Sequence, residues 1–373
     1  PFCFFMVLFM WLESFGWSFK KSVLTNGLRE LLPRILFTVI TIFLALELVG
    51  QDFYMVLFAL SYAAPGLILF VVLRRTGKFH FVNQPSNVTR RMGKRMMNFG
   101  LFVFGAHFLN LISRTIDTFI LASVSDRGLV DTAVYTIATY VVTLMEVPQR
   151  SLNAATIPVL AESWKNKDLR TIASIYKKSV SNLLIIGLAM LSLFYLNIHN
   201  LESYLGEGFE GVGFVILVIG LGKLVDLGTG ANAQIIGTSS YWKVDFLTNM
   251  LYTMVALPMN YILISKFGLK GAAYSSLISI VFYNILRYGF LYFKFGLQPY
   301  TSKNLLVLGI SIGCTLVILQ VPVFENLFID AGVRVTLFGI LFLTLIYVFR
   351  ISSEINQTIG KVISNLKSLI NRS

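Results

Sequence analysis

Polar side chains that could bind a ligand recur at helical spacing inside apolar stretches of this sequence. In the stretch 98–124 they stand at i, i+3, i+7 and i+10, which is one face of a helix: His107, Asn110, Arg114 and Asp117. A charged group at the centre of a membrane costs at least about 2.5 to 3.5 kcal/mol, so such groups usually face a cavity or a partner. This face therefore predicts a polar site inside a membrane helix.

Four other apolar stretches carry similar polar faces. In chain order their members are Arg34 in 31–48; Asp131, Tyr135, Thr139, Glu146, Arg150 and Asn153 in 129–160; Lys223, Asp226, Gly230 and Gln234 in 211–236; and Asn284 and Arg287 in 271–292.

Two interpretations of these polar faces remain open. The faces could line a water-filled cavity between two lobes. Alternatively, Arg114–Asp117, Glu146–Arg150 and Lys223–Asp226 could be neutralised pairs at i, i+3 or i+4 spacing that hold helices together.

The sequence carries no motif of an enzyme active site. It has no Walker loop, no His/Cys/Asp cluster with metal-ligand spacing and no nucleophile motif. Cys3 and Cys314 both lie in apolar runs, which predicts small core residues rather than a disulfide or a metal site. We therefore expect no enzymatic activity, no metal and no cofactor, and a secondary transporter is the class that remains.

The elements that must position these residues are membrane helices. Of the 373 residues, 56% are hydrophobic and 13% are charged, whereas a soluble domain has about 25% charged residues. A membrane span needs about 20 apolar residues. The sequence predicts an all-α, polytopic membrane protein with eleven spans, the longest bent by Pro148 and Pro158. The spans lie near 1–17, 31–48, 53–73, 98–124, 129–160, 179–197, 211–236, 245–265, 271–292, 304–322 and 335–350.

The distribution of Lys and Arg predicts the orientation. Of the 31 basic residues, 22 lie in the loops and tail on the side of loop 74–97, and 4 lie in the loops on the other side. The positive-inside rule then places loop 74–97 and the C-terminus in the cytoplasm. The net charge of +13 thus indicates topology and contact with anionic membrane lipids, and we expect no nucleic-acid binding.

An internal repeat predicts the arrangement of the helices. Two segments begin with Leu-Thr-Asn, at Leu24 and Leu247, pass Pro33 or Pro258, and cross a short turn into a second apolar stretch. This layout predicts two pseudo-repeated six-helix bundles plus two terminal helices, with about 100–130 residues of the first bundle preceding residue 1. The predicted domains are the remainder of the N-terminal lobe (1–73), a basic cytoplasmic linker (74–97), a C-terminal six-helix lobe (98–292), two additional membrane helices (293–350) and a cytoplasmic amphipathic tail (351–373).

Three segments resemble motifs of the oligosaccharide flippases. The segment "NYILISKFGLKGAAYSSLIS", from residue 260, resembles the N-x-x-L-I-x-x-x-G-x-x-G-A-A motif. The segments "YLGEGFEGVGFVILVIGLGKLVDLGTGANAQIIGTSSYWKVDFLTN" and "RTIDTFILASVSDRGLVDTAVYTIA" are similar to two further helix-and-turn patterns of that family. The chain therefore resembles the polysaccharide transporters of the multidrug/oligosaccharidyl-lipid/polysaccharide (MOP) exporter superfamily, without the first three helices of the family pattern.

The resemblance implies a function. It implies flipping of a lipid-linked oligosaccharide, such as a polyprenyl-diphosphate-linked O-antigen unit of lipopolysaccharide, across the bacterial inner membrane by alternating access. One alternative is a drug/cation antiporter of the same superfamily, although the predicted spans hold five basic and four acidic residues rather than an acidic surplus. The other alternative is a non-transporting scaffold that holds glycan-assembly membrane proteins together.

The implied substrate suggests roles for the embedded residues. A diphosphate needs cations, and arginine offers a planar fork of donors that suits phosphate oxygens. Sugars need amide and hydroxyl partners. The candidate substrate-binding residues are Arg114 and Arg150 first, then Lys223, Arg287, Arg34, Asn110 and Asn284. Asp117, Glu146 and Asp226 are the candidates for coupling to a proton or sodium gradient.

Overall fold

The chain folds into helices throughout the described residues, which are 1–19, 21–77, 79 and 86–357 of a computed structural model. Eight side chains within these ranges are also outside the description: those of Ser22, Val88, Ala106, His107, Leu109, Asn110, Ser113 and Arg114. Two compact units are present, residues 1–94 and residues 95–373. The prediction of an all-α fold is confirmed.

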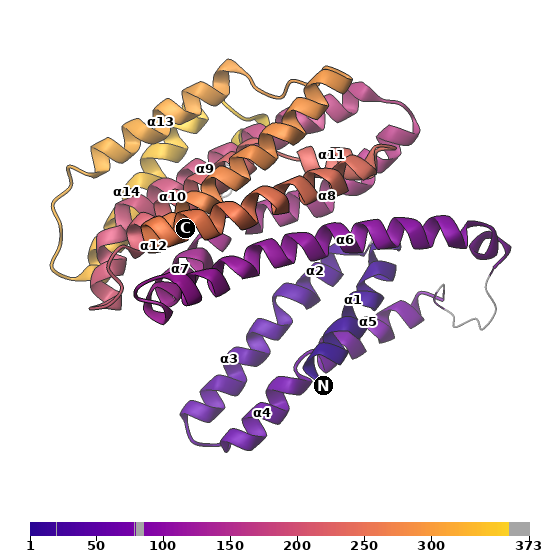
Figure 1. Cartoon of the computed structure of the whole chain (residues 1–373), viewed down its shortest axis with the longest axis horizontal. Helices are drawn as coiled ribbons and strands as arrows, with labels where there is room; N and C mark the ends of the chain where they lie inside the picture. Colours follow the sequence, from indigo (N-terminus) through magenta and orange to yellow (C-terminus); the bar gives the residue numbers. More distant parts are fainter. Residues whose placement is uncertain (20, 78, 80–85, 358–373) are drawn as a thin grey trace, which may run out of the picture. The chain divides into compact units, whose positions relative to one another are not determined.

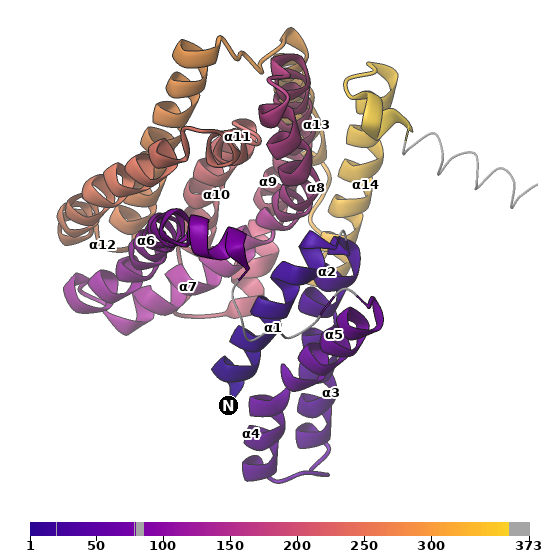
Figure 2. The same cartoon turned by 90° about the vertical axis from the view of Figure 1, so that its right-hand side faces the viewer.

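The first unit contains five helices and the start of a sixth in its described part. They are α1 (Phe2–Ser18), α2 (Ser22–Glu30), α3 (Leu32–Ala45), α4 (Gln51–Leu60), α5 (Ala63–Arg75) and the first turns of α6 (Asn87–Val124). Helix α1 packs along α5 (Figure 2), and Phe9, Leu12, Leu69 and Leu73 form the core between them. Gly16 lets α1 approach α2 closely, because a Cβ at this position would collide with the side chain of Thr25.

In its described residues, the second unit holds the rest of α6 and a bundle of eight further helices, which Figure 1 displays. These helices are α7 (Leu129–Thr143), α8 (Glu146–Lys165), α9 (Leu169–Leu205), α10 (Val212–Gly228), α11 (Asn232–Thr238), α12 (Trp242–Phe295), α13 (Ser302–Ile318) and α14 (Leu327–Val348). Helix α10 is the central element, since it packs against α7, α9 and α12. Its valines and isoleucines form a buried core with Val134, Ala138, Ala272 and Ala273.

The lengths of the helices identify a multi-pass membrane protein. Four segments of the described chain are long and apolar enough to span a membrane, and the number rises to six when two bent helix pairs count as single spans. This is fewer than the eleven predicted spans. Helix α12 contains two of the predicted spans. Three other predicted spans correspond to helices shorter than the length of about 20 residues that a span needs. These helices have 17 residues for the span 1–17, 14 for 31–48 and 17 for 304–322.

Two predicted spans are broken helices: the bend in 129–160 was predicted, whereas the break in 211–236 corrects the sequence-based assignment. The stretch 129–160 bends by 44° between α7 and α8. Pro148 has no N–H for the carbonyl of Leu144, and Val147 donates to that carbonyl instead at 3.2 Å. The stretch 211–236 bends by 48° between α10 and α11. Gly230 lies in this break with φ +61°, a backbone conformation that favours glycine.

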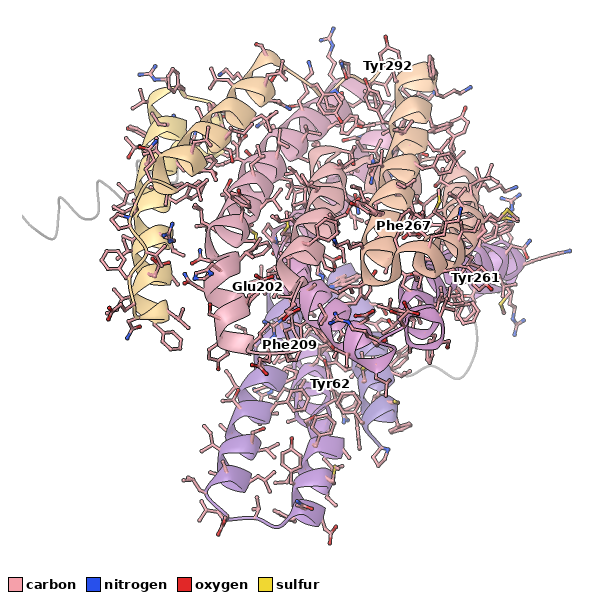
Figure 3. The ribbon with its side chains drawn as sticks, turned by 60° about the vertical axis from the view of Figure 1, so that its left-hand side comes forward. Tyr62, Glu202, Phe209, Tyr261, Phe267 and Tyr292 are labelled. Atoms are coloured by element: carbon pink, nitrogen blue, oxygen red, sulfur yellow. The ribbon has the colours of Figure 1, made fainter. Side chains whose placement is uncertain are left out.

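The segment 260–280 forms a sharp kink inside α12. Gly268 leaves the helical conformation there with φ 54° and ψ −130°, and Figure 3 labels Tyr261 and Phe267 next to this kink. A Cβ on Gly271 would collide with the backbone carbonyl of Leu263, so only glycine allows the two arms of α12 to approach this closely. The kink confirms the predicted short turn between the spans 245–265 and 271–292.

The last predicted span, 335–350, begins earlier in the structure. Helix α14 begins at Leu327 because the side chain of Asn326 accepts hydrogen bonds from the N–H groups of Phe328 and Ile329. Asp330 and Arg334, which the sequence analysis placed in a loop, are therefore helical and buried, and they pair at 2.6 Å. Helices α13 and α14 pack against each other and on α9 (Figure 2). Residues 358–373 of the predicted tail lie outside the described residues.

Candidate functional site

A cavity of about 310 Å³ lies within the second unit, between α6, α7, α8, α10 and α12. Its walls are rich in hydroxyl groups, including those of Tyr135, Tyr140, Tyr252 and Tyr283. Four charged side chains also face it: Asp117, Glu146, Lys223 and Asp226. A cavity of this size, with a few convergent polar groups among apolar walls, has the character of a small-molecule site.

Asp117 lies at one side of the cavity, and neutral groups hold it. Its Oδ2 accepts hydrogen bonds from the hydroxyl of Tyr135 at 3.2 Å and from that of Ser276 at 3.4 Å. Its Oδ1 accepts one from the amide of Asn260. These partners come from α7 and from both arms of α12. Asp117 is 7% exposed and forms no ion pair with a residue whose side chain the structure describes.

Lys223 also lines the cavity and lies between two carboxylates. Its Nζ is 2.7 Å from Asp226 Oδ2 and 3.2 Å from Glu146 Oε1. Glu146 also pairs with Arg150 at 3.1 Å. The predicted pairs Glu146–Arg150 and Lys223–Asp226 are therefore present, and Lys223 joins them into one chain of charges across α8 and α10.

Amide groups extend this chain of charges to the break between α10 and α11. Asn284 donates to Asp226 Oδ1 at 3.3 Å, and its own Oδ1 accepts from Thr229 at 2.6 Å and Asn232 at 3.1 Å. Gln149 donates to Asp226 Oδ2 at 3.3 Å. The predicted residue Asn284 thus fixes the broken helix to α12. Asp226 is held by the ammonium group of Lys223 and by two side-chain amides, so its environment is the more structural one.

Three of the predicted arginines, those with described side chains, do not line the cavity. Arg150 is about half exposed on α8 and does not line the cavity. Arg287 is buried, forms an ion pair with Asp245 and lies 4.0 Å from the ring centre of Tyr283. Arg34 belongs to the first unit and pairs with Glu30 at 2.9 Å. The backbone around Arg114, Asn110 and His107 is helical, but their side chains lie outside the described residues.

Asp131 does not share the cavity with the rest of its predicted face. Its carboxylate accepts hydrogen bonds from Ser125 and from Arg127, the latter at 2.9 Å, in the turn between α6 and α7. Tyr135, Thr139 and Glu146 of the same predicted face do line the cavity. Asp131 lies in the first turn of α7 and pairs with the preceding turn instead, so helical spacing alone could not predict which residues of the face reach the cavity.

Several polar residues within the helices were not singled out from the sequence. Ser276 and Asn260 contact Asp117, yet single Ser and Asn residues are common in membrane helices and gave no signal. Glu13, Asp330 and Arg334 are charged residues within helices, and their charge alone could have marked them. Among the described residues, no three His, Cys, Asp or Glu side chains come together as a metal site would require.

The fold and the cavity define a class, the all-α multi-pass membrane proteins with a polar cavity among their helices. A family model described as "Polysaccharide biosynthesis protein" matches residues 3–164. The solved structure "Lipid II flippase MurJ, inward closed conformation" is similar in fold, with a TM-score of 0.57 and 12% identity over 94% of this chain and 72% of that one. No curated protein sequence matches significantly. The match over residues 3–164 agrees with the predicted resemblance to the polysaccharide transporters, and the solved structure agrees with the predicted all-α membrane fold.

Proposed function

We propose that this protein is a secondary transporter that flips a lipid-linked oligosaccharide across the cytoplasmic membrane by alternating access. The observation that carries this proposal is the cavity in the second unit, where tyrosine and threonine hydroxyls lie beside ionised groups within membrane helices. Hydroxyl and amide groups suit the many hydroxyls of a sugar, and the polar surface would be costly in a protein with no polar ligand. The family and the fold support the same function.

The environments of the three candidate ion-coupling residues differ. Asp226 is engaged by Lys223, Gln149 and Asn284, and Glu146 is engaged by Lys223 and Arg150. Asp117 is held by neutral donors alone in the described part of the chain. The hydroxyls of Tyr135 and Ser276 can donate to a carboxylate or accept from a carboxylic acid, so we assign ion coupling to Asp117.

The phosphate contacts of the second unit are assigned to Arg114 and Arg150. Arg150 is available because its guanidinium is about half exposed and has one described carboxylate partner, Glu146. Arg287 is a weaker candidate, since burial, Asp245 and the ring of Tyr283 already occupy it. Lys223 is held between two carboxylates and would need to release one of them before it could bind phosphate.

Complementation tests the proposed function against its alternatives. The chain is expressed in a bacterial strain that lacks its own glycan flippase, and surface polysaccharide is measured. A flippase restores the polysaccharide. A drug/cation antiporter instead raises resistance to cationic drugs and leaves the polysaccharide absent, and a scaffold changes neither in this strain. Absence of surface polysaccharide at full expression would contradict the proposal.

A further inference from the structure

One wall of the cavity in the second unit is formed by a row of threonines along α7. Thr136, Thr139 and Thr143 all line the cavity, and their spacing of i, i+3 and i+7 places them on one face of the helix. We call these three residues the threonine row. Tyr135, which binds Asp117, directly precedes the row in the sequence. The row thus begins next to a cavity carboxylate.

The proton of each hydroxyl in the threonine row is already engaged. Thr136 Oγ1 donates to the backbone carbonyl four residues earlier at 2.7 Å, and Thr139 Oγ1 and Thr143 Oγ1 make the same bond at 2.8 Å each. A hydroxyl has one proton to donate and two lone pairs that accept. The row therefore offers hydrogen-bond acceptors, and no donors, to a ligand in the cavity.

The charged groups of the cavity wall add to this excess of acceptors. Asp117, Glu146 and Asp226 are carboxyl side chains, whereas Lys223 is the one cation among the described lining residues. The ammonium of Lys223 already lies 2.7 Å from Asp226 and 3.2 Å from Glu146. A sugar hydroxyl needs donors as well as acceptors, but an ammonium group has three donors and no acceptor. The described wall thus suits an ammonium group best.

Neighbouring oxygens of the threonine row are spaced so that one nitrogen can bind two of them. Side chains at i, i+3 and i, i+4 have Cβ atoms about 5–6 Å apart. Because all three hydroxyls make the same bond to their own helix, their oxygens keep this spacing. A nitrogen that lies about 2.9 Å from each of two oxygens spans a separation of this size. An ammonium group at Thr139 therefore reaches Thr136 or Thr143 as well.

We propose that the glycan carried by this protein bears a primary amine, and that the threonine row binds its ammonium group through Thr139 and one neighbouring threonine. The inference rests on the proposed transport function and adds a class of substrate to it. The threonine oxygens fix the directions of the N–H groups, while the carboxylates of the cavity supply negative charge. An N-acetylated amine would lose the positive charge and two of its three donors.

Substrates that differ at one nitrogen test the inference. The full chain is reconstituted into liposomes, and flipping is followed for a fluorescent polyprenyl-diphosphate-linked disaccharide that carries either a primary amine or its N-acetyl form. At pH 6 the amine is protonated, since an amine beside electron-withdrawing groups has a pKa of about 8. At low substrate concentration the amine form should be flipped about tenfold faster or more, the ratio expected for a hydrogen bond to a charged group.

Variants of α7 assign this preference to the threonine row. Thr139→Val removes the hydroxyl at nearly constant shape and should bring the two rates together, whereas Thr139→Ser should keep the preference. Thr132→Val is the matched control, because Thr132 makes the same bond, to the carbonyl of Gly128 at 2.9 Å, but does not line the cavity. A preference that persists in Thr139→Val, or that is lost equally in Thr132→Val, would overturn the assignment.

A third substrate separates hydrogen bonding from charge in the unmodified protein. A disaccharide with a trimethylammonium group keeps the positive charge but has no N–H donor. It should be flipped more slowly than the amine form, because the threonine oxygens have nothing to accept from it. Equal rates for these two forms would show that charge alone is recognised, and they would overturn the role of the threonine row.

Failure of the inference and failure of the proposed function have different signatures. A protein that flips none of the three lipids would refute the transport function and this inference with it. A protein that flips the amine and N-acetyl forms at equal rates, or that favours the N-acetyl form, would retain the proposed function. The inference of an amine-bearing substrate would then be wrong.

Discussion

At the scale of single residues, the sequence left two roles open for Arg150, which pairs with Glu146. Arg150 either binds phosphate or serves as the partner of Glu146, from which it lies 3.1 Å away. Lys223 also contacts Glu146, at 3.2 Å. Removal of Arg150 would therefore leave Glu146 with a cation, so the structural cost of removing Arg150 should be small.

We predict that Arg150→Gln keeps its expression level and thermal stability and loses transport. Arg150 is half exposed, and an exposed ion pair contributes only about 0–1 kcal/mol to stability. The check is polysaccharide export together with the melting temperature, with Glu146→Gln and the double variant as controls. Restoration of transport in the double variant would show that Arg150 serves Glu146 and not phosphate.

Asp117 is predicted to carry the dependence of transport on the ion gradient. Asp117→Asn should fold, because the new side chain can still meet Tyr135, Ser276 and Asn260. Its transport should lose the acceleration that a gradient gives, and couplings of this kind amount to about 5- to 150-fold. Transport rates are compared with and without imposed proton and sodium gradients.

Asp131→Asn is the matched control for Asp117. Asp131 is also buried, at 5% exposed, but it binds Ser125 and Arg127 in the turn before α7 rather than lining the cavity. Its variant should keep the response to the gradient. An equal loss of response in both variants would show that any buried acid in this unit has the effect, and the assignment to Asp117 would fail.

At the scale of elements, the kink of α12 depends on a glycine that allows close backbone approach. We predict that Gly271→Ala destabilises the protein by about 1–3 kcal/mol, the usual cost of overpacking, because its Cβ would meet the carbonyl of Leu263. Gly309→Ala in α13 is the control, since no atom lies within 4 Å of a Cβ there. Unfolding in detergent compares the two variants, and equal stabilities would contradict the account of the kink.

The segment that follows α14 is predicted to dock on α9 in a pH-dependent way. Lys178 binds Glu354 at 2.7 Å, and this hydrogen bond lowers the pKa of Glu354 from its ordinary 4.5 to about 2. Because the pKa is lower in the docked state, the pair stabilises docking above about pH 4.5 and loses this effect as the pH falls toward 2. Both side chains are well exposed, so the effect is small.

A distance measurement tests this docking. Spin labels at Asn356 and Arg170 should move apart in the native protein as the pH is lowered through this range. In Lys178→Gln the distance between the labels should be longer at neutral pH and should change less with pH. A distance that is independent of pH in the unmodified protein would contradict the prediction.

At the scale of the whole molecule, the sequence predicts what is local and misses what depends on the path of the chain. The pairs Glu146–Arg150 and Lys223–Asp226 were predictable because i, i+3 and i+4 neighbours meet on any helix. The contact between Lys223 and Glu146 was not, because it joins α10 to α8. The positions of Ser276 and Asn260 around Asp117 likewise depend on how the two arms of α12 fold back.

The breaks in the helices differ in how far the sequence predicts them. The prolines of 129–160 predicted a bend, whereas nothing in the hydropathy of 211–236 predicted that this stretch breaks. The bends arise from one missing N–H at Pro148 and from the positive φ of Gly230. Such backbone effects leave hydropathy unchanged, yet they place Thr229 and Asn232 against Asn284 beside the cavity.

The central claim is transport of a lipid-linked oligosaccharide through the cavity of the second unit, and a flipping assay tests it most directly. The purified chain is reconstituted into liposomes with a fluorescent lipid-linked oligosaccharide, and loss of fluorescence to a membrane-impermeant quencher is followed. The unmodified protein should accelerate this loss. Thr139→Trp, which places a large side chain in the cavity, should abolish the acceleration, whereas Leu305→Trp, at a position that is 74% exposed and does not line the cavity, should not. An unmodified protein no faster than empty liposomes, or a Thr139→Trp variant as fast as the unmodified protein, would contradict the account.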